Sequence, residues 1–163
     1  MALTFNKFNV TVQNLGQGVD NLNTGTNLYV MLTNTAPNSA DTVIDTTGGV
    51  CVLKSTSNAN EIAAGNGYTK GGVNLASGAF TQTAGLASLV ANDVTLTASG
   101  GSIGPFRYAV LYDSAGGTTS TRPVLGWWDY GSALTLNSGD SVLFQNSNAS
   151  GNFTTTYPIL TLQ

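Results

Sequence analysis

The chain has 163 residues, and charged residues make up 8% of it, against about 25% in ordinary globular domains. Thr, Ser, Asn and Gly supply 74 residues, while a hydrophobic fraction of 41% is enough to form the core of one domain of this length. The net charge of −3, with five scattered cations, excludes a nucleic-acid surface, and the absence of histidine removes the commonest general base and metal ligand.

Runs of strand length, separated by turns rich in Gly, Asn and Pro, follow one another along the whole chain. A single short helix is expected at Asn58–Ala64, where Asn58 is a candidate N-cap and Glu61 lies three residues later. The expected strands, in chain order, are Leu3–Val12, Asn27–Thr33, Gly49–Lys54, Phe80–Thr83, Asp93–Ala98, Phe106–Tyr112, Val124–Tyr130, Ser141–Gln145 and Tyr157–Leu162. The sequence therefore predicts an all-β protein: a single domain over residues 1–163, an antiparallel β-sandwich or squashed barrel with at most one short helix.

The side-chain pattern separates strands with one buried face from strands with two. Apolar residues alternate with threonine in Asp93–Ala98, which is typical of a sheet with one solvated face. Asn27–Thr33 and Phe106–Tyr112 are apolar on both faces, which indicates either central strands of a sandwich or strands covered by a partner. The two expected faces of the latter strand are Phe106, Tyr108, Val110 and Tyr112 against Ala109 and Leu111.

The N-terminal segment of residues 1–15 has two interpretations. Its apolar residues suit an arm that adds a strand to another protein, or equally an edge strand of the chain's own sheet. We find no leader peptide and no stretch apolar enough to cross a membrane, so we expect a soluble protein made in the cytoplasm.

Catalysis is not expected from this sequence. Nucleophilic triads need a histidine, and the Asp residues are scattered singly, without the dense spacing of a calcium loop. The glycine-rich segment Gly65–Gly72 lacks the spacing of a phosphate-binding loop and is predicted to be a turn. Cys51 lies between two valines, which indicates a buried structural thiol. We therefore predict no enzyme, no metal site and no cofactor.

The segment Gly126–Gly131 (GWWDYG) is the most unusual local feature. Adjacent tryptophans on a strand face opposite sides, so one enters the core while the other faces solvent, a ligand or another subunit. Exposed aromatic residues often dominate the energetics of interfaces. The residues that we expect at a partner interface are Phe5, Phe8, Tyr68, Arg107, Trp127, Trp128 and Tyr130.

Five segments together resemble, in the same order, segments of small virion proteins of tailed bacteriophages. They are Ala2–Asn9 (ALTFNKFN), Leu28–Pro37 (LYVMLTNTAP), Glu61–Gly72 (EIAAGNGYTKGG), Phe106–Asp113 (FRYAVLYD) and Gly126–Gly131, and they span nearly the whole chain. The resemblance implies a capsid cement or decoration protein, mostly β and non-enzymatic, on the outside of the mature head. It implies the major capsid protein as partner, a homo-oligomer (dimer or trimer), and no nucleic-acid or membrane ligand.

Two other functions remain compatible with the same residues. A tail or fibre-base component of the virion would share the charge-poor β composition. A carbohydrate-binding β-sandwich is the alternative from a different class, and in it Trp127 or Trp128 would stack on sugar rings.

Overall fold

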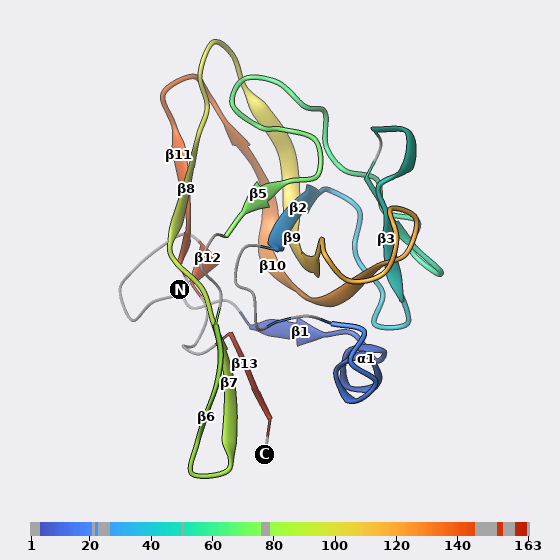
Figure 1. Cartoon of the computed structure of the whole chain (residues 1–163). Coiled ribbons are helices and arrows are strands. Elements are labelled where there is room, and N and C mark those ends of the chain that lie inside the picture. Colours follow the sequence, from blue (N-terminus) through green and yellow to red (C-terminus); the bar gives the residue numbers. More distant parts are fainter. Residues whose placement is uncertain are drawn as a thin grey trace.

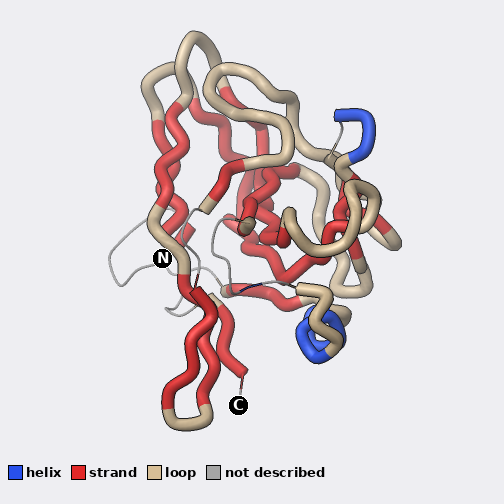
Figure 2. Tube along the Cα trace, in the orientation of Figure 1, coloured by secondary structure: helices blue, strands red, loops and turns tan. Residues whose placement is uncertain are grey.

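The computed structural model describes residues 4–20, 22, 27–49, 51–75, 79–145, 153–154 and 159–162. Strands dominate these residues (Figure 2), which confirms the all-β prediction. The strands are β1 (Phe5–Lys7), β2 (Leu28–Thr33), β3 (Val43–Asp45), β4 (Val52–Lys54), β5 (Val73–Asn74), β6 (Ala79–Thr83), β7 (Leu86–Val90), β8 (Val94–Thr97), β9 (Ile103–Asp113), β10 (Arg122–Leu136), β11 (Ser141–Gln145), β12 (Phe153–Thr154) and β13 (Leu160–Leu162). One short α-helix, α1 (Thr11–Gly16), and a 3-10 turn at Thr47–Gly49 accompany them. In this part of the chain no helix is long and apolar enough to cross a bilayer.

A seven-stranded sheet forms the centre of the fold, in the order β4-β3-β10-β9-β2-β5, with β1 paired to β10. The longest strand is β10, and one of its edges pairs with β9. Its other edge is shared, because β3 pairs with Arg122–Pro123 and β1 pairs with Gly126–Trp128. β10 therefore connects the N-terminal segment to the rest of the sheet.

Two smaller sheets complete the structure. One has the order β12-β11-β8, and the other has the order β13-β7-β6. All pairs are antiparallel except β11 with β12. Figure 1 shows that the β6–β7 hairpin, with β13 beside it, extends away from the body of the molecule.

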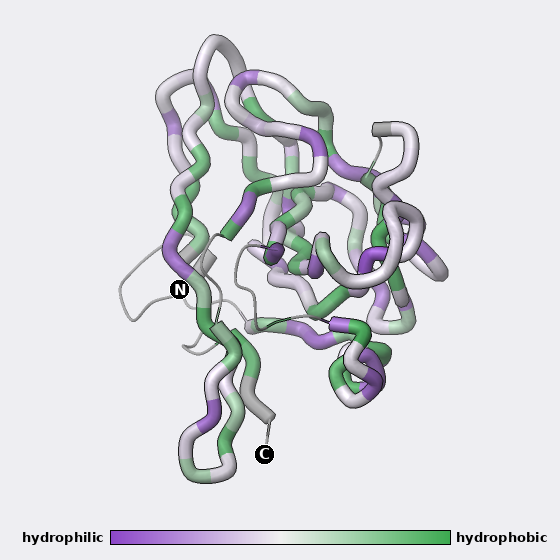
Figure 3. Tube along the Cα trace, viewed as in Figure 1, coloured by the Kyte–Doolittle hydropathy of each residue, from purple (hydrophilic) through white to green (hydrophobic). Residues whose placement is uncertain are grey.

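Each face of the central sheet packs against its own apolar cluster. The first cluster includes Val30, Leu111 and Trp128 of the sheet together with Leu96, Val142 and Phe144 of β8 and β11 and Leu89 and Leu160 of β7 and β13. The second cluster includes Met31, Ile44, Leu53, Val110 and Val124 of the sheet together with Phe8, Cys51 and Ala59. Strands β2 and β9 are thus buried on both faces by the chain itself, as expected for central strands. Figure 3 shows this concentration of hydrophobic residues on the strands, while the long loops are mostly pale or hydrophilic.

The predicted strands agree with the structure to different degrees. The alternation in Asp93–Ala98 is confirmed, because Leu96 and Ala98 are buried while Thr95 and Thr97 are exposed. Of Gly49–Lys54 only β4 is a strand, and of Tyr157–Leu162 residues 157–158 lie outside the described residues. The strands that the pattern does not predict are β3, β5, β7 and β12. Three of these have only two or three residues, which is too short for alternation to be visible.

The predicted helix at Asn58–Ala64 is wrong. Its backbone groups bond to neighbouring segments instead: Ala59 accepts from Leu53, and Ile62 donates to Leu32. Asn58 has a φ of 47°, whereas an N-cap residue typically has β-region dihedral angles. Ala59 and Ile62 enter different apolar clusters, so burial on both sides outweighs the weak local helix signal.

The helix lies instead at Thr11–Gly16, which corrects the prediction of a strand over all of Leu3–Val12. The Thr11 hydroxyl donates to the carbonyl oxygens of Val124 and Leu125, at 3.2 and 2.8 Å. These two hydrogen bonds hold Thr11 against β10, and the chain leaves the sheet between the end of β1 and this residue. A tertiary contact, and not the alternation of apolar residues, therefore marks the end of the strand.

The expected faces of Phe106–Tyr112 also need one correction. Phe106 packs in the first cluster together with Leu111, whereas Val110 and Tyr112 pack in the second. The cause is an irregular register, since Tyr108 lies opposite Asp129 but Phe106 lies opposite Leu134. The additional residues of β10 form a bulge in its ladder with β9, and across this bulge the side chains of β9 no longer alternate regularly between the two faces of the sheet.

The Gly65–Gly72 segment is a turn structure, as predicted. Gly72 has a φ of 94°, and a Cβ atom there would lie 2.1 Å from the carbonyl oxygen of Val30. Glycine at this position allows the loop to contact the backbone of β2.

The hairpin turn between β6 and β7 generates a prediction on stability. Ala84 has a φ of 51° and Gly85 a φ of 86°, so an alanine occupies a left-handed position that favours glycine or asparagine. We expect Ala84→Gly to raise the free energy of unfolding by about 0.5–1 kcal/mol, because relief of the strain exceeds the extra entropy of glycine in the unfolded chain. Urea denaturation measures this change. The matched control Ala79→Gly, within strand β6, should lower stability by a similar amount, and a loss in both variants would contradict the turn geometry.

Candidate interaction surface

Residues 5–8 of the N-terminal segment lie along one edge of β10. In β1, Phe5 lies opposite Trp128 and Lys7 lies opposite Gly126. The contact continues past the strand, where the Phe8 amide donates to the carbonyl oxygen of Leu125 at 3.3 Å. In the structure, Phe5–Lys7 is thus an edge strand of the chain's own sheet.

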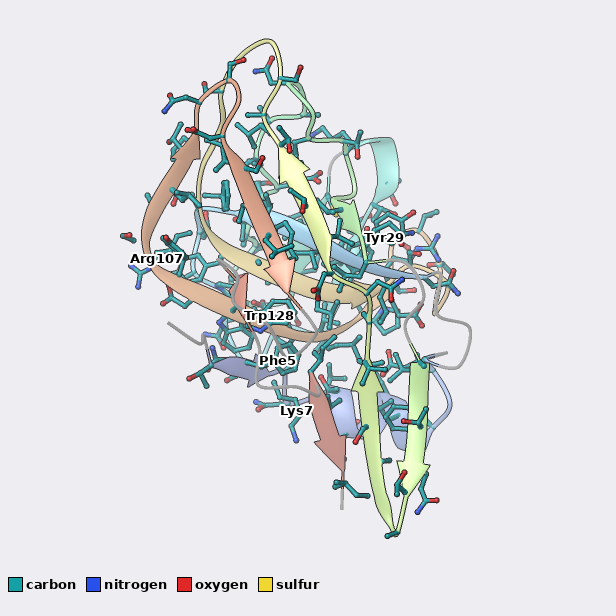
Figure 4. The ribbon with its side chains drawn as sticks, turned by 90° about the vertical axis from the view of Figure 1, so that its left-hand side faces the viewer. Phe5, Lys7, Tyr29, Arg107 and Trp128 are labelled. Atoms are coloured by element: carbon teal, nitrogen blue, oxygen red, sulfur yellow. The ribbon has the colours of Figure 1, made fainter. Side chains whose placement is uncertain are left out.

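The two tryptophans of β10 face opposite sides, and each contacts one phenylalanine of the N-terminal segment. The Phe5 ring lies 4.9 Å from the Trp128 ring, in the first apolar cluster. The Phe8 ring lies 4.6 Å from the Trp127 ring, beside the second cluster. Trp128 is 2% exposed and Trp127 is half-buried. Figure 4 shows Phe5 directly beneath Trp128. The N-terminal segment therefore covers both faces of β10 at this edge.

Glycine at position 126 makes this arrangement possible. A Cβ atom there would lie 2.3 Å from Cζ of Phe5 and 2.5 Å from the carbonyl oxygen of Asn6. The Phe5 ring thus occupies the space that any other side chain at this position would fill. Gly126 also ends an irregularity in the ladder, since Val124 pairs with Tyr112 and Gly126 with Leu111.

Arg107 and Asp129 form a bidentate ion pair across β9 and β10. The distances are 2.7 Å from Nε to Oδ1 and 2.8 Å from Nη2 to Oδ2. The guanidinium group holds the pKa of Asp129 below its usual range, and the Gly131 amide donates to the same carboxylate. Arg107 also lies 5.1 Å from the centre of the Tyr108 ring. Both side chains of the pair are about one-third exposed, so they contribute little to stability but offer charge and hydrogen-bonding groups at the surface.

Tyr68 belongs to a different, buried network. Its hydroxyl accepts from the Leu32 amide at 3.0 Å and donates to Oε1 of Glu61 at 2.7 Å. Burial raises the pKa of Tyr68 and that of Glu61, while the hydrogen bond from Tyr68 acts in the opposite direction on Glu61. Tyr68 thus attaches the glycine-rich loop to β2.

The residues that the sequence predicts for an interface differ in location and in burial. Six of them gather around Gly126–Tyr130 of β10, and Tyr68 lies in the Gly65–Gly72 loop. Phe8, Tyr68 and Trp128 are buried in the chain's own clusters, whereas Phe5, Arg107, Trp127 and Tyr130 are half-buried. Nothing in the sequence pairs Asp129 with Arg107, because the pairing depends on the register between β9 and β10.

Other chemistry is limited in the part of the chain that the structure describes. The Cys51 thiol is buried as predicted, and burial raises its pKa to about 12. Among these residues no group of three or more His, Cys, Asp or Glu side chains is placed to hold a metal ion. No protein-family model, curated protein or solved structure matches the chain.

The contact between Phe5 and Gly126 can be tested by substitution. We expect Gly126→Ala to displace β1 and to lower the free energy of unfolding by about 1–3 kcal/mol, because the added methyl group overlaps the ring and the backbone. The displaced strand would be cut by trypsin after Lys7, which mass spectrometry of limited digests detects. Gly16→Ala is the matched control, since its Cβ meets nothing within 4 Å and a helical alanine is favourable. Equal digestion of the two variants would contradict the arrangement.

The Tyr68–Glu61 network predicts a dependence of stability on pH. Tyr68→Phe should cost about 1–3 kcal/mol at pH 7, because Glu61 and the Leu32 amide lose their partner. The raised pKa of Glu61 means that the folded state holds its proton to a higher pH than the unfolded state, so stability falls as pH rises above 4.5. Loss of the Tyr68 hydrogen bond raises this pKa further and steepens the fall.

Urea denaturation at pH 4, 5.5 and 7 measures this effect, with Tyr29→Phe as the control. The half-buried Tyr29 ring contacts Tyr112 and keeps that contact without its hydroxyl. A loss in Tyr68→Phe that is the same at all three pH values would show that Glu61 does not titrate with folding.

Proposed function

We propose that the chain is a non-enzymatic structural protein of a tailed-phage virion: a cement protein that binds the outside of the mature head. In this role it contacts the major capsid protein, stabilises the contacts between neighbouring capsomers, and assembles as a homo-dimer or trimer. No cofactor takes part.

The observation that carries the proposal is where the five resembling segments lie in the fold. Four of them contribute β1, β10, β9 and β2, which are consecutive neighbours in the central sheet. The fifth, Glu61–Gly72, contacts β2 through the hydrogen bond between Tyr68 and Leu32. Segments that are scattered in the sequence thus form one packed unit, which supports a fold shared with the phage proteins that they resemble.

The character of the surface also supports the proposal. Among the described residues one salt bridge is present, between Arg107 and Asp129, and solubility depends on hydroxyl and amide groups. An interface made of such groups and of half-buried aromatic rings is less sensitive to ionic strength than one made of charge pairs. Ligands that bind only the assembled shell stabilise it by mass action, and many modest contacts act in parallel.

The contact surface that we assign to the capsid lies at the β1 edge of the sheet, where Trp127 is partly exposed on one face and Phe5 and Tyr130 are partly exposed on the other, with Arg107 on β9. These side chains come from β1, β9 and β10 and combine aromatic area with one planar cation, a composition typical of interface hot spots. The N-terminal strand is held in the chain's own sheet, so the proposal does not require it to add to a partner.

Cosedimentation with expanded heads tests this function. Heads made from the major capsid protein of the same phage are mixed with the purified chain, with unexpanded heads as the comparison. We expect saturable binding to expanded heads in a simple ratio to capsid subunits, with little change between 0.1 and 0.5 M NaCl. Arg107→Ala should weaken binding about tenfold, while Thr95→Ala, an exposed position on β8, should leave it unchanged.

Two results would contradict the proposal. Absence of binding to expanded heads would exclude a cement role. Binding of the isolated chain to glycans, lost in Trp127→Ala, would establish the carbohydrate-binding alternative instead.

A further inference from the structure

Strand β6 is the longest of the strands that pair on one edge only in the described part of the chain. It has five residues, whereas β1, β4, β5, β8, β12 and β13 have two to four. Its inner edge pairs with β7 over five consecutive residues, without a shift in register. Among the described residues no strand pairs with its outer edge. The hairpin extends away from the body of the molecule (Figure 1), so another protein can reach this edge.

The outer edge of β6 lacks the features that usually prevent edge strands from pairing with other chains. Such strands are commonly very short, bulged, or supplied with lysine or proline. β6 has the sequence AFTQT, and no charged residue occurs from Gly71 to Asn92. Each chain carries a net charge of −3, so two copies repel each other in general. At this hairpin they can meet without bringing like charges together.

The turn of the hairpin determines which main-chain groups of β6 face outward. The turn at Ala84–Gly85 has two residues, both with positive φ, as in a type I′ turn. The residues that flank such a turn exchange two hydrogen bonds, and bonded and non-bonded pairs then alternate along the ladder. Thr83 and Thr81 therefore bond to β7. The main-chain N–H and C=O groups of Phe80 and Gln82 point to the outer edge.

We propose that β6 pairs with β6 of a second copy of the chain, antiparallel and around a two-fold axis at Thr81. In this register Phe80 of each copy lies opposite Gln82 of the other, so all the outward donors and acceptors of these residues are matched. The two Thr81 residues face each other in a non-hydrogen-bonded pair, where contacts between threonines are favourable. Any other two-fold register that matches outward groups places Phe80 or Gln82 opposite a residue outside β6.

The pairing joins the three-stranded sheets of the two copies into one continuous sheet. Because the contact is the same on both copies, it closes as a dimer and leads to no further growth. It therefore selects the dimer from the oligomers that the proposed function includes, and it uses none of the residues assigned to the capsid contact. The inference rests on the proposed function only for the expectation of a homo-oligomer, and it can be tested without phage heads.

Sedimentation equilibrium of the whole chain tests the oligomeric state. We expect a dimer whose dissociation constant changes little with NaCl concentration, because the contact contains no charges. Thr81→Lys introduces two like charges that face each other at the axis, and it should weaken the dimer about tenfold or more. Thr81 is exposed, so this change does not affect the core. Thr95→Lys, at an exposed threonine of β8, is the matched control and should dimerise like the wild type.

Disulfide cross-linking tests the register. The Cα atoms of a non-hydrogen-bonded antiparallel pair are roughly 4.5 Å apart, within reach of a disulfide. Thr81→Cys should therefore form a covalent dimer with oxidised glutathione, which accepts the two electrons of the two thiols. Thr83→Cys is the matched control on the same face of the strand. In this register its two copies are roughly 14 Å apart, four residues along the strand, and should not cross-link. The buried Cys51 thiol of the wild type should not react.

The possible results separate this pairing from the cement role. A monomeric wild type, a trimer that Thr81→Lys does not dissociate, or equal cross-linking of the two cysteine variants would overturn the pairing. A monomer that binds expanded heads and loses this binding in Thr81→Lys would also overturn it, and would assign the β6 edge to a capsid strand. A dimer with the expected cross-link that does not bind heads would support the pairing and exclude only the cement role.

Discussion

The docking of the N-terminal segment on the edge of β10 is the contact on which the arrangement of the sheet depends. Phe5 and Phe8 lie on opposite faces of one strand and cover one tryptophan each. The contact is possible because position 126 has no side chain, and it ends where Thr11 bonds to the carbonyl oxygens of β10. Both apolar clusters border this one edge, so Phe5 and Phe8 together stabilise both clusters.

The contact with Phe5 and Phe8 reduces how much of the two tryptophans is exposed at the surface. The pair of tryptophans is an unusual sequence feature, but Trp128 is buried and Trp127 has one neighbour ring already in place. What reaches the surface is a rim of half-buried rings and the Arg107–Asp129 pair. A rigid rim on a packed strand suits a protein that holds other subunits in position, since few groups have to be ordered on binding.

The sequence predicts the class of the fold and much of its centre, because long apolar strands carry a visible pattern. β2 and β11 are close to their predicted bounds, and the opposite faces of Trp127 and Trp128 follow from strand geometry. Where tertiary contacts override local preference, prediction fails. Residues 58–64 have a helix-like start but bond to β2 and β4, and the helix Thr11–Gly16 begins at the residue whose hydroxyl bonds to β10.

The candidate interaction surface shows the same limit. Pairing of Arg107 with Asp129 depends on a register between β9 and β10 that includes several irregularities. This pairing leaves no signal in residue spacing.

We propose that the chain is a structural component of a phage head, and its copy number per purified virion, measured by quantitative mass spectrometry against the major capsid protein, tests this proposal. For a cement protein we expect hundreds of copies in a simple ratio to capsid subunits. A few copies to a few dozen would instead place the protein at the tail or the portal vertex, and absence from the virion would rule out a virion role.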